Sequence, residues 1–303
     1  MAPLSPVVEP AMESLPVRLY AAFAADETGG NMGAVVFEDM PLWPAARQRI
    51  AADLCAPTTG FVRELSDGRY ETRFHSTRSE MDMCGHVTLA VFAALKEDGR
   101  IGPGSYVQQT AAGEIGVEVT SDGAVTLHQP LPSFDRNEVM REEIAPLLGL
   151  EQDLVWRVTA SSTALRHVFV QLADLETLAS IRPDDAALRA FCRDRSIDTI
   201  GVWCRQASGL GKAKVRLRDL CHGVGDPEEA ASGTTNGALA CDMFRSENLL
   251  PGAGGTAVLV AEQGFEMGRP SIVRTVLGTS GKDITSVSVG GYAALRLRGE
   301  FSI

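Results

Sequence analysis

The chain has 303 residues, of which 45% are hydrophobic and 22% are charged, and its formal net charge is −11. This length favours two domains of ordinary size, each with its own hydrophobic core. The acidic balance, without a cluster of Lys and Arg, excludes a nucleic-acid partner. No segment approaches the ~18 consecutive apolar residues of a membrane-spanning helix, so we expect a soluble globular protein without a membrane partner.

The N-terminal segment and the cysteines indicate the compartment. The first 15 residues are rich in proline and lack the basic and apolar regions of a signal peptide, so we expect a flexible leader over residues 1–15 and a cytoplasmic protein. The six cysteines include no Cys-X-X-Cys pair, which indicates reduced thiols rather than disulfides or a zinc site. We therefore predict no metal.

Hydrophobic periodicity and turn residues predict the elements in chain order. In the first part of the chain we expect strands at 15–24, 33–38, 59–65, 69–76, 105–121 and 124–130, with helices at 44–55 and from about 85 to 96. In the second part we expect helices at 141–150, 184–195 and 232–244, and strands at 166–172, 199–205, 212–220, 255–264, 269–277, 284–292 and 293–301. The predicted fold class is α+β, with far more strand than helix.

Two segments resemble each other. "CGHVTLAVFAAL" opens an apolar helix in the first half, and "SGTTNGALACDMF" does the same in the second, which indicates an internal repeat. Both helices are apolar on nearly all sides, so we expect each to be enclosed by a curved sheet. If their N-termini meet in a cleft, their unpaired backbone N–H groups form a receptor for a carboxylate.

Three motifs carry a family resemblance: "TGGNMGAVVF" (28–37), "FHSTRSEMDMCGHVTLA" (74–90) and "DPEEAASGTTNGALA" (226–240). Together they resemble the phenazine biosynthesis PhzF-like isomerases of the diaminopimelate epimerase and proline racemase superfamily. The resemblance implies two pseudo-symmetric halves, each a barrel-like sheet around a central helix, with the active site between them and no cofactor. It places the N-terminal half at 16–130, the C-terminal half at 131–285, and a closing strand at 286–303 that returns to the N-terminal half.

The resemblance also suggests the catalytic groups. Superfamily racemases place one cysteine at each central helix N-terminus, whereas this sequence has Cys84 at the first position and Ser232 at the second. Thiols ionise far more readily than hydroxyls, and a helix N-terminus favours the thiolate. Cys84 is therefore predicted to be a base, while Ser232 needs a separate base to act in the same way. Isomerisation or elimination is favoured over racemisation.

A second departure concerns the PhzF-type glutamate, because Thr58 stands at its position in "APTTGFV". The acid and base duties then fall on Cys84, with His86, His75, Glu80 or Glu229 as assistants. A buried inert thiol is the simpler interpretation of Cys84, and Ser232 is also an ordinary N-cap residue. The predicted catalytic residues are Cys84, Ser232, His86 and Glu229, and the predicted substrate-binding residues are Asn31, Thr58, His75, Gly85, Gly233, Thr234 and Thr235.

From these residues we predict a cofactor-independent isomerase that shifts a carbon–carbon double bond in a small, carboxylate-bearing biosynthetic intermediate. Relatives with a similar pattern include the double-bond isomerases of alkylproline biosynthesis in antibiotic pathways, so a proline-derived substrate is considered. The alternatives are a dehydratase or a racemase or epimerase of a proline-like amino acid, and a ligand-binding protein that has lost catalysis. A homodimer is also considered, because edge strands favour pairing.

Overall fold

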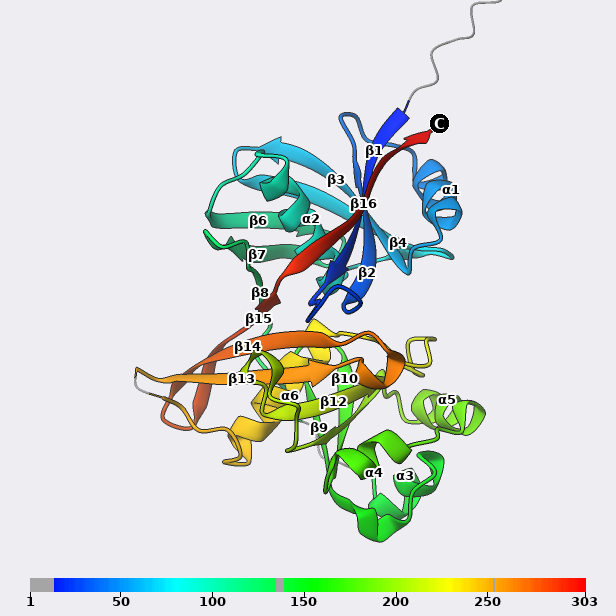
Figure 1. Cartoon of the computed structure of the whole chain (residues 1–303), viewed down its shortest axis with the longest axis vertical. Coiled ribbons are helices and arrows are strands. Elements are labelled where there is room, and N and C mark those ends of the chain that lie inside the picture. The colour runs from blue at the N-terminus through cyan, green and yellow to red at the C-terminus, as the bar shows by residue number, and fades with distance from the viewer. Residues whose placement is uncertain (1–13, 135–138, 253) are drawn as a thin grey trace, which may run out of the picture.

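A computed structural model describes residues 14–134, 139–252 and 254–303 (Figure 1). The predicted leader lies outside this range except for Ser14 and Leu15, which begin the first strand. Within the described residues, sixteen strands join in one sheet that winds through both halves of the molecule. The predicted α+β class with two similar halves is confirmed.

The N-terminal half holds seven main strands, a short strand β5 and two helices among the described residues. They are β1 (Ser14–Ala22), β2 (Asn31–Phe37), α1 (Pro44–Leu54), β3 (Thr58–Ser66), β4 (Arg69–Ser76), β5 (Glu80–Met81), α2 (Gly85–Glu97), β6 (Gly104–Thr110), β7 (Gly113–Val119) and β8 (Val125–Gln129).

The C-terminal half repeats this arrangement with three outer helices among the described residues in place of one. Its described elements are α3 (Arg141–Leu147), β9 (Val155–Ser162), β10 (Arg166–Leu172), α4 (Leu175–Ser180), α5 (Asp185–Asp194), β11 (Thr199–Cys204), β12 (Val215–Leu220), α6 (Gly233–Arg245), β13 (Thr256–Gln263), β14 (Ser271–Ser280) and β15 (Asp283–Gly291), followed by β16 (Ala293–Ser302).

The strand order shows the internal symmetry. The path β1-β2-β3-β4-β6-β7-β8 has its second and fourth pairs parallel and the other pairs antiparallel. The path β9-β10-β11-β12-β13-β14-β15 follows the same sequence of parallel and antiparallel pairs. By this correspondence α2 follows β4 as α6 follows β12, so the two apolar helices occupy equivalent places.

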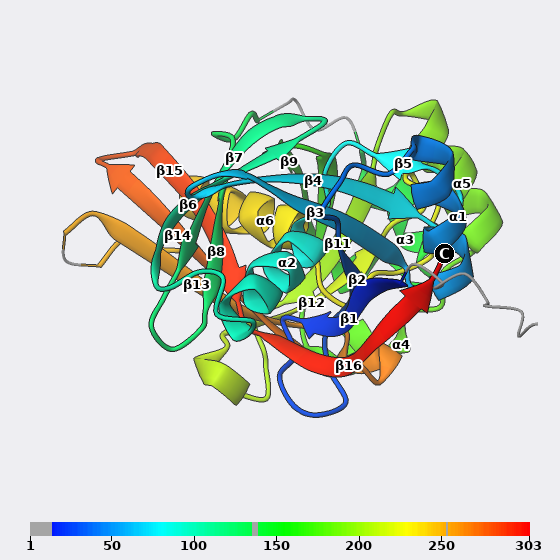
Figure 2. The same ribbon diagram turned by 90° about the horizontal axis from the view of Figure 1, so that it is seen from above.

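Each apolar helix fills the inside of its half. Seen from above, α2 lies inside the strands of the N-terminal half (Figure 2), and it packs with Phe74, Val117 and Leu127 in one buried cluster. The strands approach it closely, since a Cβ atom at Gly33 would lie 2.7 Å from Val87 Cγ2. Helix α6 packs likewise with Phe169 and Leu217. Apolar faces all round these helices therefore reflect enclosure, not a membrane.

The remaining helices cover the outer faces. Helix α1 begins at Pro44, whose fixed φ suits the first helical position, and packs with Phe61 on the outside of the N-terminal half. Helices α3, α4 and α5 contribute Ile144, Leu178 and Leu188 to a separate cluster outside the C-terminal half. This outer layer leaves the first turns of α2 and α6 to meet between the halves.

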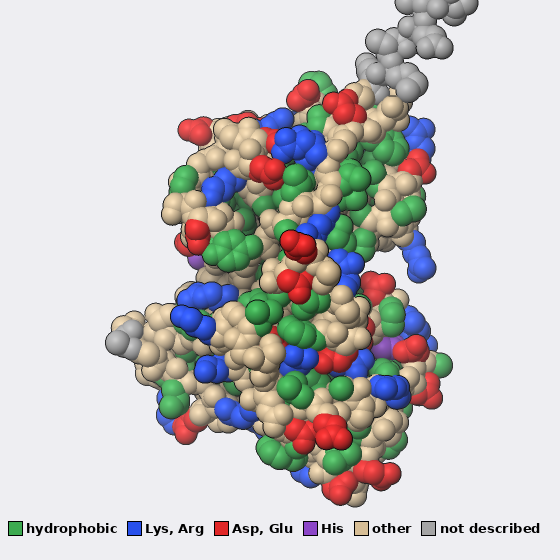
Figure 3. All heavy atoms as spheres, in the orientation of Figure 1, with side chains coloured by type: hydrophobic (Ala, Val, Ile, Leu, Met, Phe, Trp, Pro, Cys, Tyr) green, Lys and Arg blue, Asp and Glu red, His purple; other side chains and the backbone are tan. Residues whose placement is uncertain are grey.

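Strand pairing helps to join the halves. Strand β8 pairs with β15, and β16 crosses back to pair with β1 along the whole of that strand (Figure 1). No helix in the described part of the chain is long and apolar enough to cross a membrane. Charged side chains of both signs are interspersed over the face seen in Figure 3, without a tract of one sign.

Candidate active site

Cys84 and Ser232 are the N-cap residues of the two enclosed helices. Their backbones have nearly the same extended conformation, with φ −146° and ψ 110° at Cys84 and φ −127° and ψ 118° at Ser232. Each residue is 6% exposed. Gly85 and Gly233 are the first helical residues, so both helices begin with a small residue that leaves the N-terminal N–H groups accessible.

The two N-caps differ in what their side chains do. Ser232 Oγ accepts a hydrogen bond from Thr235 N–H at 3.4 Å, whereas the Cys84 side chain makes no capping bond to α2. Ser232 Oγ also lies 3.1 Å from Thr234 Oγ1, and its backbone N–H donates to Gln263 Oε1 at 3.2 Å. The hydroxyl therefore belongs to a hydrogen-bonded network, while the sulfur is available for chemistry.

His86 and Glu229 connect the halves beside this sulfur. Cys84 Sγ lies 3.5 Å from His86 Nδ1 and 3.7 Å from Nε2. His86 Nδ1 lies 3.4 Å from Glu229 Oε1, which comes from the loop before α6. The Asn31 side-chain amide at the start of β2 donates to Glu229 Oε1 and to the Ala231 carbonyl, both at 2.9 Å. Residues from three distant segments thus hold the two helix N-termini together.

These contacts determine the charge on His86. Burial by itself lowers its pKa, but the negative charge and hydrogen bond of Cys84, followed by those of Glu229, outweigh burial and raise the pKa to about 10. Both hydrogens of the Asn31 amide are already used by Glu229 and Ala231, so the short 3.2 Å approach of Asn31 Nδ2 to His86 Nδ1 is not a donated bond. His86 Nδ1–H instead donates to Glu229. The Cys84 sulfur, the His86 ring and the Glu229 side chain therefore form a series that crosses between the halves.

The structure does not bring all predicted residues to this place. Side chains alternate along β3 and β4, and Gly60 and Phe74 face α2. Thr58 shares the face of Gly60, and its Oγ1 contacts Met81 Sδ at 3.8 Å. His75 lies on the opposite face: its ring packs edge-on against Phe61, and Nδ1 lies 3.0 Å from Gln48 Oε1 of α1.

His75 is therefore a buried group under α1 and, among the described residues, makes no hydrogen bond or ring contact with Cys84, His86 or Glu229. Burial lowers its pKa, which favours the neutral ring. The exposed Glu80 on β5 lies 3.8 Å from Arg73 and is likewise outside the series formed by Cys84, His86 and Glu229. The sequence already indicated which face of β4 holds His75. His75 alternates in step with the charged residues Arg69, Glu71 and Arg73, whereas Tyr70, Thr72 and Phe74 form the buried inner face.

Sequence reasoning missed several residues that line the second N-terminus. Gln263 at the end of β13 accepts from Ser232 N–H and from the Asn236 side chain. Thr235 contacts Asp219 of β12, a carboxylate that is fully buried. The available signal was a polar or charged residue inside an otherwise buried strand, as in the segment Val215–Leu220.

The site thus places a buried thiol beside a charged imidazole ring, at a helix N-terminus between two like halves. The family follows from comparison with known proteins. Residues 20–299 match the PhzC-PhzF family model, described as phenazine biosynthesis-like protein, and the chain belongs to this family. The predicted family is confirmed.

Individual relatives agree on the class of reaction. The chain is 32% identical over 307 residues to an uncharacterised isomerase of Deinococcus radiodurans, covering 96% of this chain and 97% of that protein. It is 29% identical to the trans-2,3-dihydro-3-hydroxyanthranilate isomerase of Pseudomonas fluorescens, with coverages of 92% and 96%. The crystal structure of a Bacillus anthracis PhzF-family protein matches with a TM-score of 0.86 at 23% identity, over 96% and 100% of the chains. The protein is an isomerase of the PhzF type.

Proposed function

We propose that the protein shifts a carbon–carbon double bond in a small cyclic carboxylate, with Cys84 as the base and no cofactor. The observation that carries this proposal is the uncapped Cys84 sulfur, 3.5 Å from a His86 ring whose proton is held by Glu229. An imidazolium beside a thiolate stabilises the charged, reactive form of the sulfur. This arrangement favours a working base over an inert core thiol.

The substrate carboxylate binds at the helix N-termini in this proposal. Neither α2 nor α6, both fully described, has an acidic residue in its first turn, so the positive end of each helix dipole is not neutralised. The N–H groups at Gly85 and at Gly233 to Thr235 then hold the carboxylate while Asn31 fixes the distance between the halves. Thr58, on the face of β3 that looks toward α2, completes the proposed wall.

The chemistry conserves the composition of the substrate. The Cys84 thiolate takes a proton from an α or allylic carbon, breaking a C–H bond and forming S–H, and the electron pair is delocalised into the neighbouring double bond and carbonyl. A proton then adds at another carbon, so the double bond moves without loss of mass. A proline-like or dihydroaromatic amino acid fits this scheme, and a biosynthetic role follows from the relative that acts on trans-2,3-dihydro-3-hydroxyanthranilate.

Proton exchange tests the proposal directly. The intact protein, Cys84→Ala and the exposed-cysteine control Cys55→Ala are incubated in D2O with trans-2,3-dihydro-3-hydroxyanthranilate and a panel of unsaturated, proline-like amino acids. We expect deuterium at one carbon and a shifted ultraviolet band at unchanged chemical composition, both lost only in Cys84→Ala. Loss of water from the substrate would instead establish a dehydratase. Tight binding without exchange in any protein would refute the isomerase proposal.

A further inference from the structure

Three neighbouring strands place polar side chains below the N-terminus of α6, where the rest of their inner face is apolar. Phe169, Gly201 and Leu217 pack inside the C-terminal half, and the inward positions nearest Ser232 are His167 of β10, Thr199 of β11 and Asp219 of β12. Each of the three polar residues is at most 2% exposed. Such groups are costly to bury and need a reason to be there.

A chain of hydroxyls connects the deepest of these groups to the active site. Thr235 Oγ1 donates to Asp219 Oδ2 at 2.7 Å and lies 3.1 Å from Ser232 Oγ. Thr235 itself has no solvent exposure, so this connection is not interrupted by water. The other Asp219 oxygen, Oδ1, has no hydrogen-bond partner among the described residues. A proton held on Oδ2 can therefore pass to Thr235, whose own hydroxyl proton then points at Ser232 Oγ.

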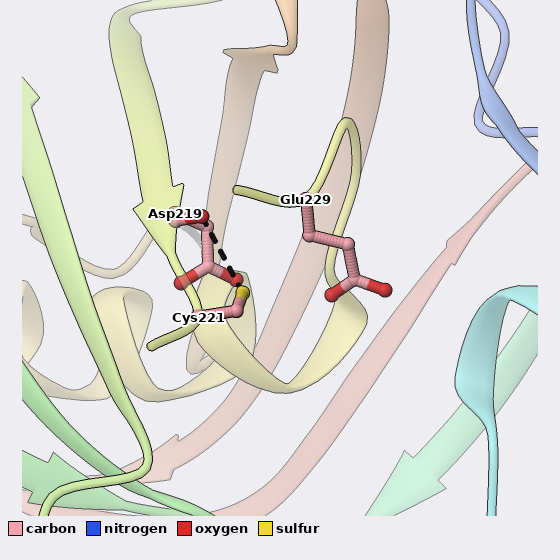
Figure 4. A group of neighbouring side chains, drawn as sticks. All are labelled: Asp219, Cys221 and Glu229. Atoms are coloured by element: carbon pink, nitrogen blue, oxygen red, sulfur yellow. Dashed lines mark hydrogen bonds between the residues drawn. The ribbon is translucent and has the colours of Figure 1, made fainter. Parts of the chain in front are cut away.

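The groups around Asp219 favour a protonated Asp219 over a cluster in which every group is charged. Asp219, Cys221 and Glu229 each bring one ligand-type atom within 4.8 Å of the others (Figure 4). The Cys221 thiol donates to the Asp219 carbonyl at 3.4 Å, and burial with the nearby carboxylates raises its pKa well above the ordinary value. It is therefore a neutral thiol in this arrangement.

The remaining titratable neighbour does not neutralise Asp219. His167 Nδ1 lies 2.6 Å from Thr199 Oγ1 and 3.5 Å from Thr235 Oγ1, and burial lowers the pKa of this ring to about 3. Burial, followed by the charge of Glu229, raises the pKa of Asp219 to about 7, although the hydrogen bond from Thr235 opposes this. Near neutral pH both protonation states of Asp219 are populated.

We propose that Asp219 is a buried proton store which, through Thr235, lets Ser232 return the proton that completes the isomerisation. The inference rests on the proposed function and identifies the group that makes its second proton transfer. Cys84 takes a proton from one carbon; Ser232 O–H gives its proton to another carbon, Thr235 reprotonates Ser232, and protonated Asp219 reprotonates Thr235. The enzyme is left with a Cys84 thiol and an Asp219 carboxylate, and exchange with water after product release restores both.

This relay explains how a serine can transfer a proton at the position where superfamily racemases have a second cysteine. A hydroxyl alone is too weak an acid or base for carbon, but a hydroxyl hydrogen-bonded to a titrating carboxylate acts as its extension. Ser232 belongs to the helix opposite Cys84, so removal and return come from different halves. Asp219 acts through other residues and never touches the substrate, so it is a positioning and relay residue.

The test compares Asp219→Asn, Thr235→Val and the hydroxyl-preserving control Thr235→Ser. With a panel compound that the intact protein turns over in D2O, two rates are followed: washout of a label at the carbon that Cys84 deprotonates, and formation of product. We expect Asp219→Asn and Thr235→Val to slow product formation about 100-fold while washout persists, and Thr235→Ser to restore product formation. Equal slowing of both rates, or no recovery in Thr235→Ser, would overturn the relay.

A second readout needs no substrate, so it separates failure of the relay from failure of the proposed function. Infrared titration of the intact protein is expected to show a buried carboxylic acid band that disappears with a midpoint near pH 7 and is absent in Asp219→Asn. If no panel compound exchanges but this band is present and shifts in Thr235→Val, the relay stands and the substrate class is wrong. The relay would be overturned if Asp219 is ionised at every pH of the titration. It would also be overturned if the intact protein binds one equivalent of a divalent cation and Cys221→Ser does not.

Discussion

The charge on His86 provides the sharpest test of the active-site description, because it depends on two neighbours and needs no substrate. A rise of the His86 pKa from 6.5 to about 10 corresponds to roughly 5 kcal/mol of preference for the charged ring. Burial opposes this preference, so the anionic neighbours supply more than the net amount. Cys84 contributes more than Glu229. Removing the thiolate should therefore lower the pKa of His86 toward or below 6.5.

The measurement is a titration of isotope-labelled histidines by NMR, with the His86 signal assigned from a His86→Gln variant. We expect the imidazolium to persist through neutral pH in the intact protein and to lose its proton near pH 10. In Cys84→Ser the midpoint should fall by several pH units, in Glu229→Gln by less, and in the exposed-cysteine control Cys55→Ser not at all. An unchanged midpoint in Cys84→Ser, or a larger effect of Glu229→Gln, would refute the thiolate–imidazolium pair.

Three further predictions concern Ser232, Asp219 and Arg47. Ser232→Cys places a thiol at the second N-terminus as well as the first. We expect this variant to exchange deuterium with inversion at the α-carbon of L-proline, at a rate about 100-fold above that of the intact protein as measured by chiral chromatography. A folded variant that shows no inversion would contradict this. Asp219 holds its proton more tightly when folded, so stability falls as pH rises from about 4 to about 7. The free energy of unfolding of Asp219→Asn, measured in urea, should rise relative to that of the intact protein across this pH window by up to about 4 kcal/mol. A difference that stays constant with pH would contradict this. Arg47 makes two bonds of 2.8 and 2.7 Å to the buried Glu38, so Arg47→Met should cost about 3–5 kcal/mol in urea unfolding, much of it recovered by adding Glu38→Gln.

Local signals in the sequence were sufficient for most of the elements. The apolar runs after Cys84 and Ser232 predicted the two enclosed helices within one or two residues, and Pro44 predicted the start of α1. The strand segments of both halves were also predicted, with the exceptions of β9 and the short β5. Strand β9, Val155–Ser162, lies at an end of the sheet and mixes exposed Trp156 with polar residues, so its sequence lacks clear alternation.

The face of a strand was harder to predict than the strand itself. Thr58 was placed in the predicted site because it stands at the position of the PhzF-type glutamate, and His75 because it could assist Cys84. The pairing of Gly60 with Phe74 instead directs Thr58 toward α2 and His75 toward α1. Which of the two faces is inner depends on where the crossover helices pack, and that is a property of the folded half.

The sequence by itself determined what lies at the two helix N-termini, a thiol at one and a hydroxyl at the other, because a helix start is written in consecutive residues. It also carried the repeat that makes the two ends equivalent. Only the tertiary structure decided which groups surround them. His86 meets Glu229 143 residues along the chain, and Ser232 reaches Asp219 through a helical turn and a neighbouring strand. These contacts depend on closing two curved sheets around their helices, and no local pattern records how such a closure brings side chains together.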